Sequence, residues 1–168
     1  MKKYGIGLFV LVVGVLPMVL FASQEKMHSR VKFRPLTAEE VERFHGHLGP
    51  MVVLGVRIGE HAVTERKIPR YFGLTVRVEC PAKPPATCIL DGLQQSTGAT
   101  MGKKNIEHII ADDIKVTITD TDTGKQVTYR IKESTQALLK QWGEEGLDVE
   151  EQGHRLFRMK AEHLFDME

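Results

Sequence analysis

Two histidines separated by one glycine are the residues whose types and spacing point most directly to chemistry. They belong to the segment Phe44-His45-Gly46-His47-Leu48-Gly49-Pro50. Residues two apart do not share a helix face, but in an extended or irregular backbone both imidazoles point to the same side and can reach one metal ion. Gly46 supplies the backbone freedom of such a loop. The alternative is that one imidazole caps the preceding helix and the other is solvated, and the local pattern leaves both open.

A second cluster combines a thiol, a carboxylate and two carboxamides. At helical spacing Cys88, Asp91 and Gln95 fall on one side of a helix, with Gln94 at its edge. Such a stripe could supply a metal ligand, an acid/base and an orienting hydrogen-bond partner. The competing interpretation is a small buried cysteine beside an ordinary polar face.

The two cysteines of the chain allow a different use of Cys88. In an oxidising compartment a Cys80–Cys88 disulfide would close a short proline-rich loop and stabilise the fold by roughly 2.5 kcal/mol. A bridged Cys88 cannot bind a metal, so the disulfide and the metal ligand exclude each other.

A glycine-rich segment follows, from Ser96 to Asn105. It is not a phosphate loop, because only three residues separate Gly98 from Gly102 and Lys104 stands where a Ser or Thr should follow Lys103. We therefore reject nucleotide hydrolysis. The segment predicts a turn that brings Lys103 near the end of the Cys88 helix, either for an anionic ligand or to cap helix carbonyls.

Charge and hydropathy separate the N-terminal segment from the rest of the chain. The whole chain has 23 basic and 22 acidic residues, which is far too balanced for a nucleic-acid binder. Lys2 and Lys3 are the only charged residues before Glu25, and the stretch between Lys3 and Glu25 is apolar. Residues 1–23 are predicted to be a signal peptide or an N-terminal membrane anchor, and residues 24–36 a tether. The remainder is expected outside the cytoplasm, in the periplasm or cell envelope, with the membrane involved only through the N-terminal segment.

The elements that position these residues predict an α+β fold with a small, at least partly antiparallel sheet packed with helices. Thr37-Ala38-Glu39-Glu40 is a capping box that begins a short helix. Gly55 and Gly59 form a smooth stripe on the next helix, where another backbone can approach closely. We expect helices over 37–44, 51–66, 88–97, 133–142 and 148–165, a strand over 71–79, and a hairpin of 113–119 with 125–131.

Taken together and in this order, the motifs resemble the FmdE domain family, which takes its name from formylmethanofuran dehydrogenase. The family pattern has a His-x-His followed by Cys-Pro, a Cys-x-x-Asp-x-x-Gln helix and a Thr-Gly-Cys-Thr-x-Gly-Lys loop. The match covers roughly Leu36 to Ile131, within a domain that we place at 37–168. Gly49 and Ala99 stand where many members have the two further cysteines.

The resemblance implies a homodimeric α+β domain with a pocket for a divalent metal, zinc, and a small-molecule ligand. Carried over by position, His45, His47 and Cys88 would be the metal ligands, and Asp91, Gln94 and Lys103 the ligand-binding residues around them. We expect an FmdE-like domain recruited to the envelope. The alternative is a non-catalytic accessory module that handles metal or cofactor for an envelope redox system, with Cys80–Cys88 as a structural disulfide. No residue pattern identifies a substrate or decides whether the protein is an enzyme.

Overall fold

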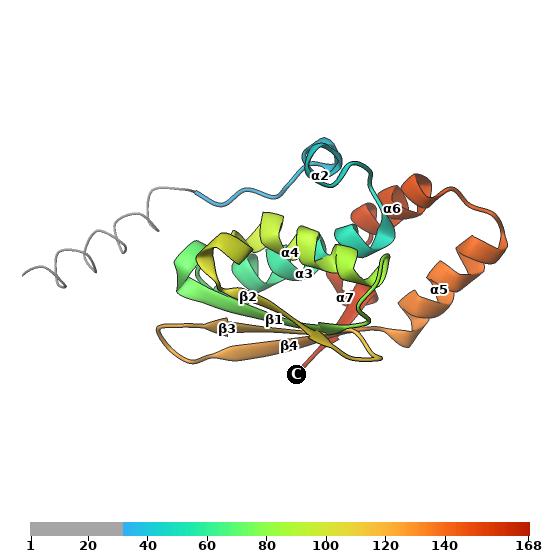
Figure 1. Ribbon diagram of the computed structural model, residues 1–168. Coiled ribbons are helices and arrows are strands. Elements are labelled where there is room, and N and C mark those ends of the chain that lie inside the picture. Colours follow the sequence, from blue (N-terminus) through green and yellow to red (C-terminus); the bar gives the residue numbers. More distant parts are fainter. Residues whose placement is uncertain (1–31) are drawn as a thin grey trace, which may run out of the picture. The chain divides into compact units, whose positions relative to one another are not determined.

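A five-stranded mixed sheet with helices over one face makes up the folded part of the protein. The computed structural model describes residues 32–168, and the folded unit begins at Phe33. Figure 1 shows α3 and α4 lying over the sheet, with α2 and α6 further from it. The strand order is β2-β1-β3-β4-β5, with β1 and β2 parallel and the other neighbours antiparallel. The elements are α2 (Ala38–His45), α3 (Pro50–Thr64), η1 (Tyr71–Gly73), β1 (Leu74–Cys80), η2 (Ala86–Cys88), α4 (Ile89–Thr97), η3 (Met101–Lys103), β2 (Ile106–Ile110), β3 (Lys115–Asp120), β4 (Gln126–Ile131), α5 (Glu133–Glu144), α6 (Val149–Arg158), α7 (Ala161–Leu164) and β5 (Phe165–Met167).

Local signals set the limits of α2 as expected. The Thr37 hydroxyl accepts from the Glu40 amide at 3.3 Å, and the Glu40 carboxylate accepts from the Thr37 amide at 3.0 Å, which completes the capping box. The helix ends at Gly46, whose φ of 96° is in the left-handed region. Pro50 then occupies the first turn of α3. The two histidines therefore lie in the connection between these helices.

The close packing predicted from the glycine stripe of α3 is confirmed. A Cβ atom at Gly55 would lie 2.2 Å from the carbonyl oxygen of Ile89, and one at Gly59 would lie 2.0 Å from the Ser96 hydroxyl. From the other side, a Cβ atom at Gly92 would lie 2.0 Å from the carbonyl oxygen of Val52. Because the two backbones touch, α4 has a fixed position on α3.

The sheet contains the expected strand and hairpin together with two strands that the sequence did not indicate. In β1 buried side chains such as Val76 and Val78 alternate with more exposed ones, and β3–β4 turns at Asp120, whose carboxylate accepts from two following amides. β2 lies at the free edge of the sheet beside β1, and of its side chains only Ile106 is buried. The sheet is therefore mixed.

The single helix predicted over 148–165 is wrong beyond Arg158. After α6 the backbone turns extended at Met159, α7 is one turn long, and the chain finishes in β5. Phe165 is 2% exposed and packs edge-on against Tyr129, with the ring centroids 5.2 Å apart. Burial of this ring and pairing with β4 outweigh the helical pattern of the segment.

None of the helices in residues 32–168 has the length and apolar character that a membrane crossing requires. The predicted signal or anchor at 1–23 lies outside the described residues.

Candidate functional site

His45 and Asp91 form the centre of the candidate site, where the end of α2 meets the first turn of α4. The Nδ1 atom of His45 lies 2.8 Å from Oδ2 of Asp91. The His45 side chain is only 9% exposed, whereas Asp91 is 40% exposed. Because a carboxylate accepts, Nδ1 carries the proton of this hydrogen bond, and the Nε2 atom of a neutral ring then has a free lone pair. Nε2 is buried and has no hydrogen-bond partner.

His47 lies against His45, as the close spacing suggested. The two ring centroids are 4.8 Å apart and the ring planes are inclined by 38°. A Cβ atom at Gly49 would lie 2.9 Å from Nε2 of His47. A glycine at position 49 therefore leaves the space that the His47 ring uses.

The loop that carries the two histidines is supported by α6. Leu48 is fully buried, and a Cβ atom at Gly153 would lie 1.7 Å from its carbonyl oxygen. His154 adds a contact to α2 through Glu42, with 3.6 Å between Nε2 and Oε1. Sequence reasoning missed Gly153, although a glycine inside a helical pattern costs stability and can be present for a packing reason.

Cys88 stands at the start of α4 as a half-buried free thiol. Burial first, and then the negative charge of Asp91, raise the pKa of this thiol, and a backbone hydrogen bond offsets part of the effect. Cys80 is fully buried in β1, is also free, and has its pKa raised by burial. The structure therefore gives no support to the Cys80–Cys88 disulfide.

The two carboxamides of α4 have different partners. Gln94 donates to Oδ1 of Asp91 over 3.4 Å, a long hydrogen bond beside the His45 contact. Gln95 donates to the Glu40 carbonyl at 2.7 Å, and its buried Oε1 atom has no partner. Gln94 thus lies at the site, and Gln95 ties the middle of α2 to α4.

Lys103 lies apart from the predicted site residues around His45 and Asp91, and Cys88 is linked to them only through the charge of Asp91. Lys103 follows the opposite end of α4, and the rise from Asp91 to Thr97 alone is about 9 Å. Its Nζ atom lies 5.8 Å from the centroid of the Phe72 ring and 3.4 Å from the Thr100 hydroxyl. Neither contact involves the residues around Asp91.

The predicted ligands do not form a ready-made metal cage. Within residues 32–168 there is no group of three or more His, Cys, Asp or Glu side chains that could hold a metal ion as they stand. The imidazole nitrogens of His45 and His47 and the sulfur of Cys88 are nevertheless donor types that suit zinc. The Nε2 atom of His45, which has no hydrogen-bond partner, has a lone pair that could bind the ion.

A third histidine, which sequence reasoning also missed, lies away from this site on α3. Nδ1 of His61 is 3.0 Å from the hydroxyl of the buried Tyr129, and its ring packs edge-on against Phe165. Burial is the main cause that lowers the pKa of His61. No local pattern distinguishes this histidine, because its partners come from β4 and β5.

An α+β domain whose His-x-His loop meets a Cys-x-x-Asp-x-x-Gln helix has the features of one family. The family model described as "FmdE, Molybdenum formylmethanofuran dehydrogenase operon" matches residues 44–167. The chain therefore belongs to the FmdE family, and the match extends further toward the C-terminus than the expected limit at Ile131. No curated protein matches the chain.

Proposed function

We propose that this protein is an FmdE-family domain of the cell envelope that binds one divalent metal ion, zinc, and presents it to a small ligand. His45, His47 and Cys88 would hold the ion, with Asp91 and Gln94 at the edge of the site. Bound zinc would supply a Lewis acid with a position open to the ligand.

The observation that carries the proposal is the environment of His45. Metal-binding histidines commonly donate one ring N–H to a carboxylate, which fixes the tautomer and directs the other nitrogen to the metal. His45 has this arrangement, with Nδ1 on Asp91 and a buried, partnerless Nε2. A buried polar atom without a partner is costly, and a ligand at Nε2 would remove that cost.

The chain's own residues have two further tasks at this site. Metal binding would require His47 and Cys88 to turn toward Nε2 of His45, because the three donors are not gathered in the structure. Cys88 would also have to lose its proton, since burial and Asp91 favour the thiol. The contact of Gly153 with the Leu48 carbonyl keeps the loop backbone in place while the side chains move.

A second candidate function is a non-catalytic accessory module that handles metal or cofactor for an envelope redox system. The raised pKa of Cys88 favours it, because a thiol that stays protonated is a weak nucleophile. This candidate was expected to carry a Cys80–Cys88 disulfide, which would remove Cys88 from the metal site, and both cysteines are free in the structure. The two candidates also differ in whether a reaction takes place at the site. A turnover that Cys88→Ala abolishes would exclude the accessory module.

Elemental analysis of the full chain, isolated without chelators, tests the metal site. We expect about one zinc ion per chain, and loss of it in the His45→Ala/His47→Ala double variant. The control is His163→Ala, which removes a histidine that is 62% exposed on α7. The proposal fails if the protein contains no stoichiometric metal and the double variant takes up metal as the wild type does.

A further inference from the structure

An exposed apolar and basic surface lies at the end of the domain where η1 and η3 meet. We call it the η1–η3 patch and define it as Arg70, Phe72, Met101, Lys103 and Lys104. Met101 is 70% exposed and Phe72 is 41% exposed, and Lys104 is exposed beside them. Single exposed apolar residues are common on soluble proteins, but two of them among three cations form a distinct surface.

Hydrogen bonds hold the two short helices of the patch side by side. The Asn105 side chain donates to the carbonyl oxygens of Tyr71 and Leu74, at 2.5 and 3.0 Å. The same side chain accepts from the Thr100 amide at 3.0 Å. The apolar and basic side chains are therefore presented by a fixed backbone, not by a loose loop.

The positive charge of the patch is not neutralised by ion pairs. Within residues 32–168, none of Arg70, Lys103 and Lys104 forms a salt bridge. The guanidinium of Arg70 instead lies over the rings of Tyr71 and Phe33, at 4.6 and 5.4 Å, and its buried Nε atom has no hydrogen-bond partner. Lys103 lies over the Phe72 ring. Aromatic faces attract these cations without cancelling their charge.

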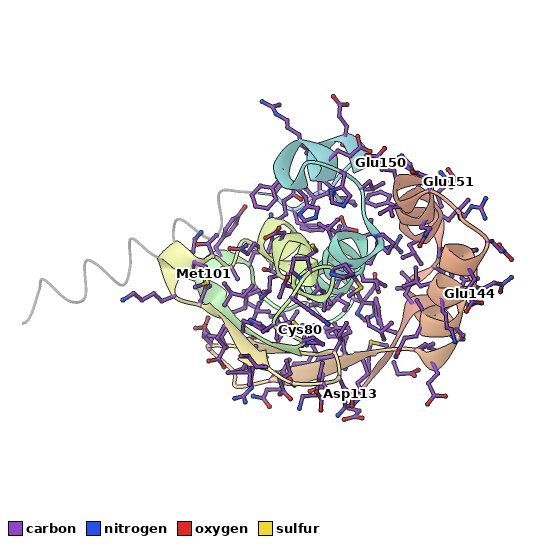
Figure 2. The ribbon with its side chains drawn as sticks, turned by 45° about the vertical axis from the view of Figure 1, so that its right-hand side comes forward. Cys80, Met101, Asp113, Glu144, Glu150 and Glu151 are labelled. Carbon is purple, nitrogen blue, oxygen red and sulfur yellow. The ribbon has the colours of Figure 1, made fainter. Side chains whose placement is uncertain are left out.

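The other end of the domain has a modest excess of acidic residues, with six acidic and three basic side chains over residues 133–158. Figure 2 shows Met101 at one end and Glu144, Glu150 and Glu151 at the other. Part of this negative charge is paired, because Glu144 lies beside Lys140 and Glu151 beside Arg155. The remaining excess would turn the patch toward a negatively charged surface only weakly.

The chain enters the domain next to the patch. Phe33, the first residue of the folded unit, contacts Arg70. Where the predicted N-terminal segment 1–23 is an anchor and not a cleaved signal peptide, it ends ten residues before Phe33, and ten residues span at most about 35 Å. A chain that leaves a bilayer after Ser23 would therefore hold Phe33, beside the patch, within reach of the headgroups.

We propose that the η1–η3 patch is a docking surface for a lipid bilayer that contains anionic headgroups. Lys103, Lys104 and Arg70 contact the headgroups, and Met101 and Phe72 enter the interfacial region. This inference rests on the envelope location in the proposed function and does not depend on the metal site. Lys103, which lies too far from His45 to act at the metal site, would act in membrane docking.

Lysine acetylation in vesicles tests the inference with the full chain. The protein is reconstituted into neutral phosphatidylcholine vesicles and into vesicles with about one third phosphatidylglycerol, and labelled with a membrane-impermeant acetylating reagent. Mass spectrometry gives the labelling rates of Lys103 and Lys104 relative to Lys140 and Lys160. These two internal controls lie on α5 and just before α7 and are 78% and 77% exposed. A ratio of rates is insensitive to the side of the vesicle on which the domain lies.

We expect the relative rate at Lys103 and Lys104 to fall about fivefold in anionic vesicles only, and to recover in about 0.5 M salt. Met101→Asp should abolish the protection, whereas Lys140→Glu should leave it unchanged. Equal relative rates in both kinds of vesicle would overturn the docking surface. Protection in the absence of anionic lipid would overturn it too, because the contact would then be with neutral lipid or with a second copy of this chain. Flotation of the vesicles reports separately whether the chain is anchored, and failure to float with either composition would overturn both the anchoring and the docking surface.

Discussion

Replacing Asp91 by asparagine changes the charge beside His45 while keeping the shape of the side chain. In the structure Oδ2 of Asp91 accepts from Nδ1 of His45 at 2.8 Å. The carboxamide oxygen introduced by Asp91→Asn can still accept this hydrogen bond, so the ring keeps its tautomer. What is lost is the negative charge, which would strengthen the bond between the imidazole and a bound metal ion.

The size of the effect follows from the exposure of the carboxylate. Loss of an outer carboxylate behind a metal-binding histidine lowers metal affinity by about 10- to 100-fold. Asp91 is 40% exposed, so solvent screens part of its charge, and we expect the lower end of this range. The predicted loss is about tenfold in the dissociation constant for zinc, which corresponds to about 1.4 kcal/mol.

A competition titration against a chromophoric zinc chelator measures this change in the full-chain protein. Asp113→Asn is the matched control, because it makes the same chemical change at an exposed carboxylate in the β2–β3 connection. Urea unfolding of each variant shows whether lost affinity is lost stability. Wild-type zinc affinity in Asp91→Asn, alongside a clear loss in His45→Asn, would refute the role given to Asp91.

Three further predictions concern stability and thiol chemistry. Gly92→Ala should destabilise the domain by about 3 kcal/mol in urea unfolding, because the new Cβ would lie 2.0 Å from the Val52 carbonyl oxygen. The control Gly143→Ala, whose new Cβ would have no atom within 4 Å, should stabilise α5 by about 0.5–1 kcal/mol. Equal effects of the two variants would contradict the α3–α4 packing. Because burial lowers the pKa of His61, the unfolded chain binds a proton at this histidine more readily than the folded chain does. The free energy of unfolding should therefore fall as the pH drops from about 7.5 to 5.5, through the unfolded pKa near 6.5. His61→Asn should flatten this dependence, and an unchanged profile in the variant would rule out His61 as its source. A thiol reagent should label Cys88 in the folded protein and reach the fully buried Cys80 only after unfolding. In denaturant without reductant, both thiols should react. If neither thiol reacts until a reductant is added, the two cysteines form a disulfide and that alternative is restored.

Features that depend on neighbouring residues were accessible from the sequence. The capping box at Thr37 and Glu40 formed as expected, because both partners lie within one turn. The glycine spacing of α3 correctly indicated a close backbone approach, since small residues four apart lie on one helix face. The β3–β4 hairpin also followed from its alternation and its turn.

Features that depend on distant residues were not accessible. The hydrogen bond between His45 and Asp91 joins residues 46 apart, and nothing in either local pattern states that they meet. β2 is an edge strand whose side chains are mostly not buried, so the usual alternation of apolar residues is absent. Phe165 lies in a segment with a helical pattern and becomes a strand because Tyr129 and His61 offer its ring a buried place.

For the candidate site, the sequence suggested residues, and the structure shows which of the suggested residues meet. His45, His47, Asp91 and Gln94 are close to one another, and Cys88 is near enough to Asp91 for its pKa to be affected. Lys103 shares a motif with them in the chain but lies past the opposite end of α4. Motif order therefore indicated the family more reliably than it indicated contact.

The position of β5 in the sheet has a consequence for how the protein is made. β5 is the last of the five strands to be synthesised, yet Phe165 packs on His61 from α3 and Tyr129 from β4, and the backbones of Thr128 and Glu168 exchange two hydrogen bonds. The sheet cannot be completed while these residues are still in the ribosome, because a nascent chain there lacks the strand that covers Tyr129. Folding to the final structure must therefore follow translation of the whole domain, and the nascent chain stays incompletely folded and accessible to chaperones until then.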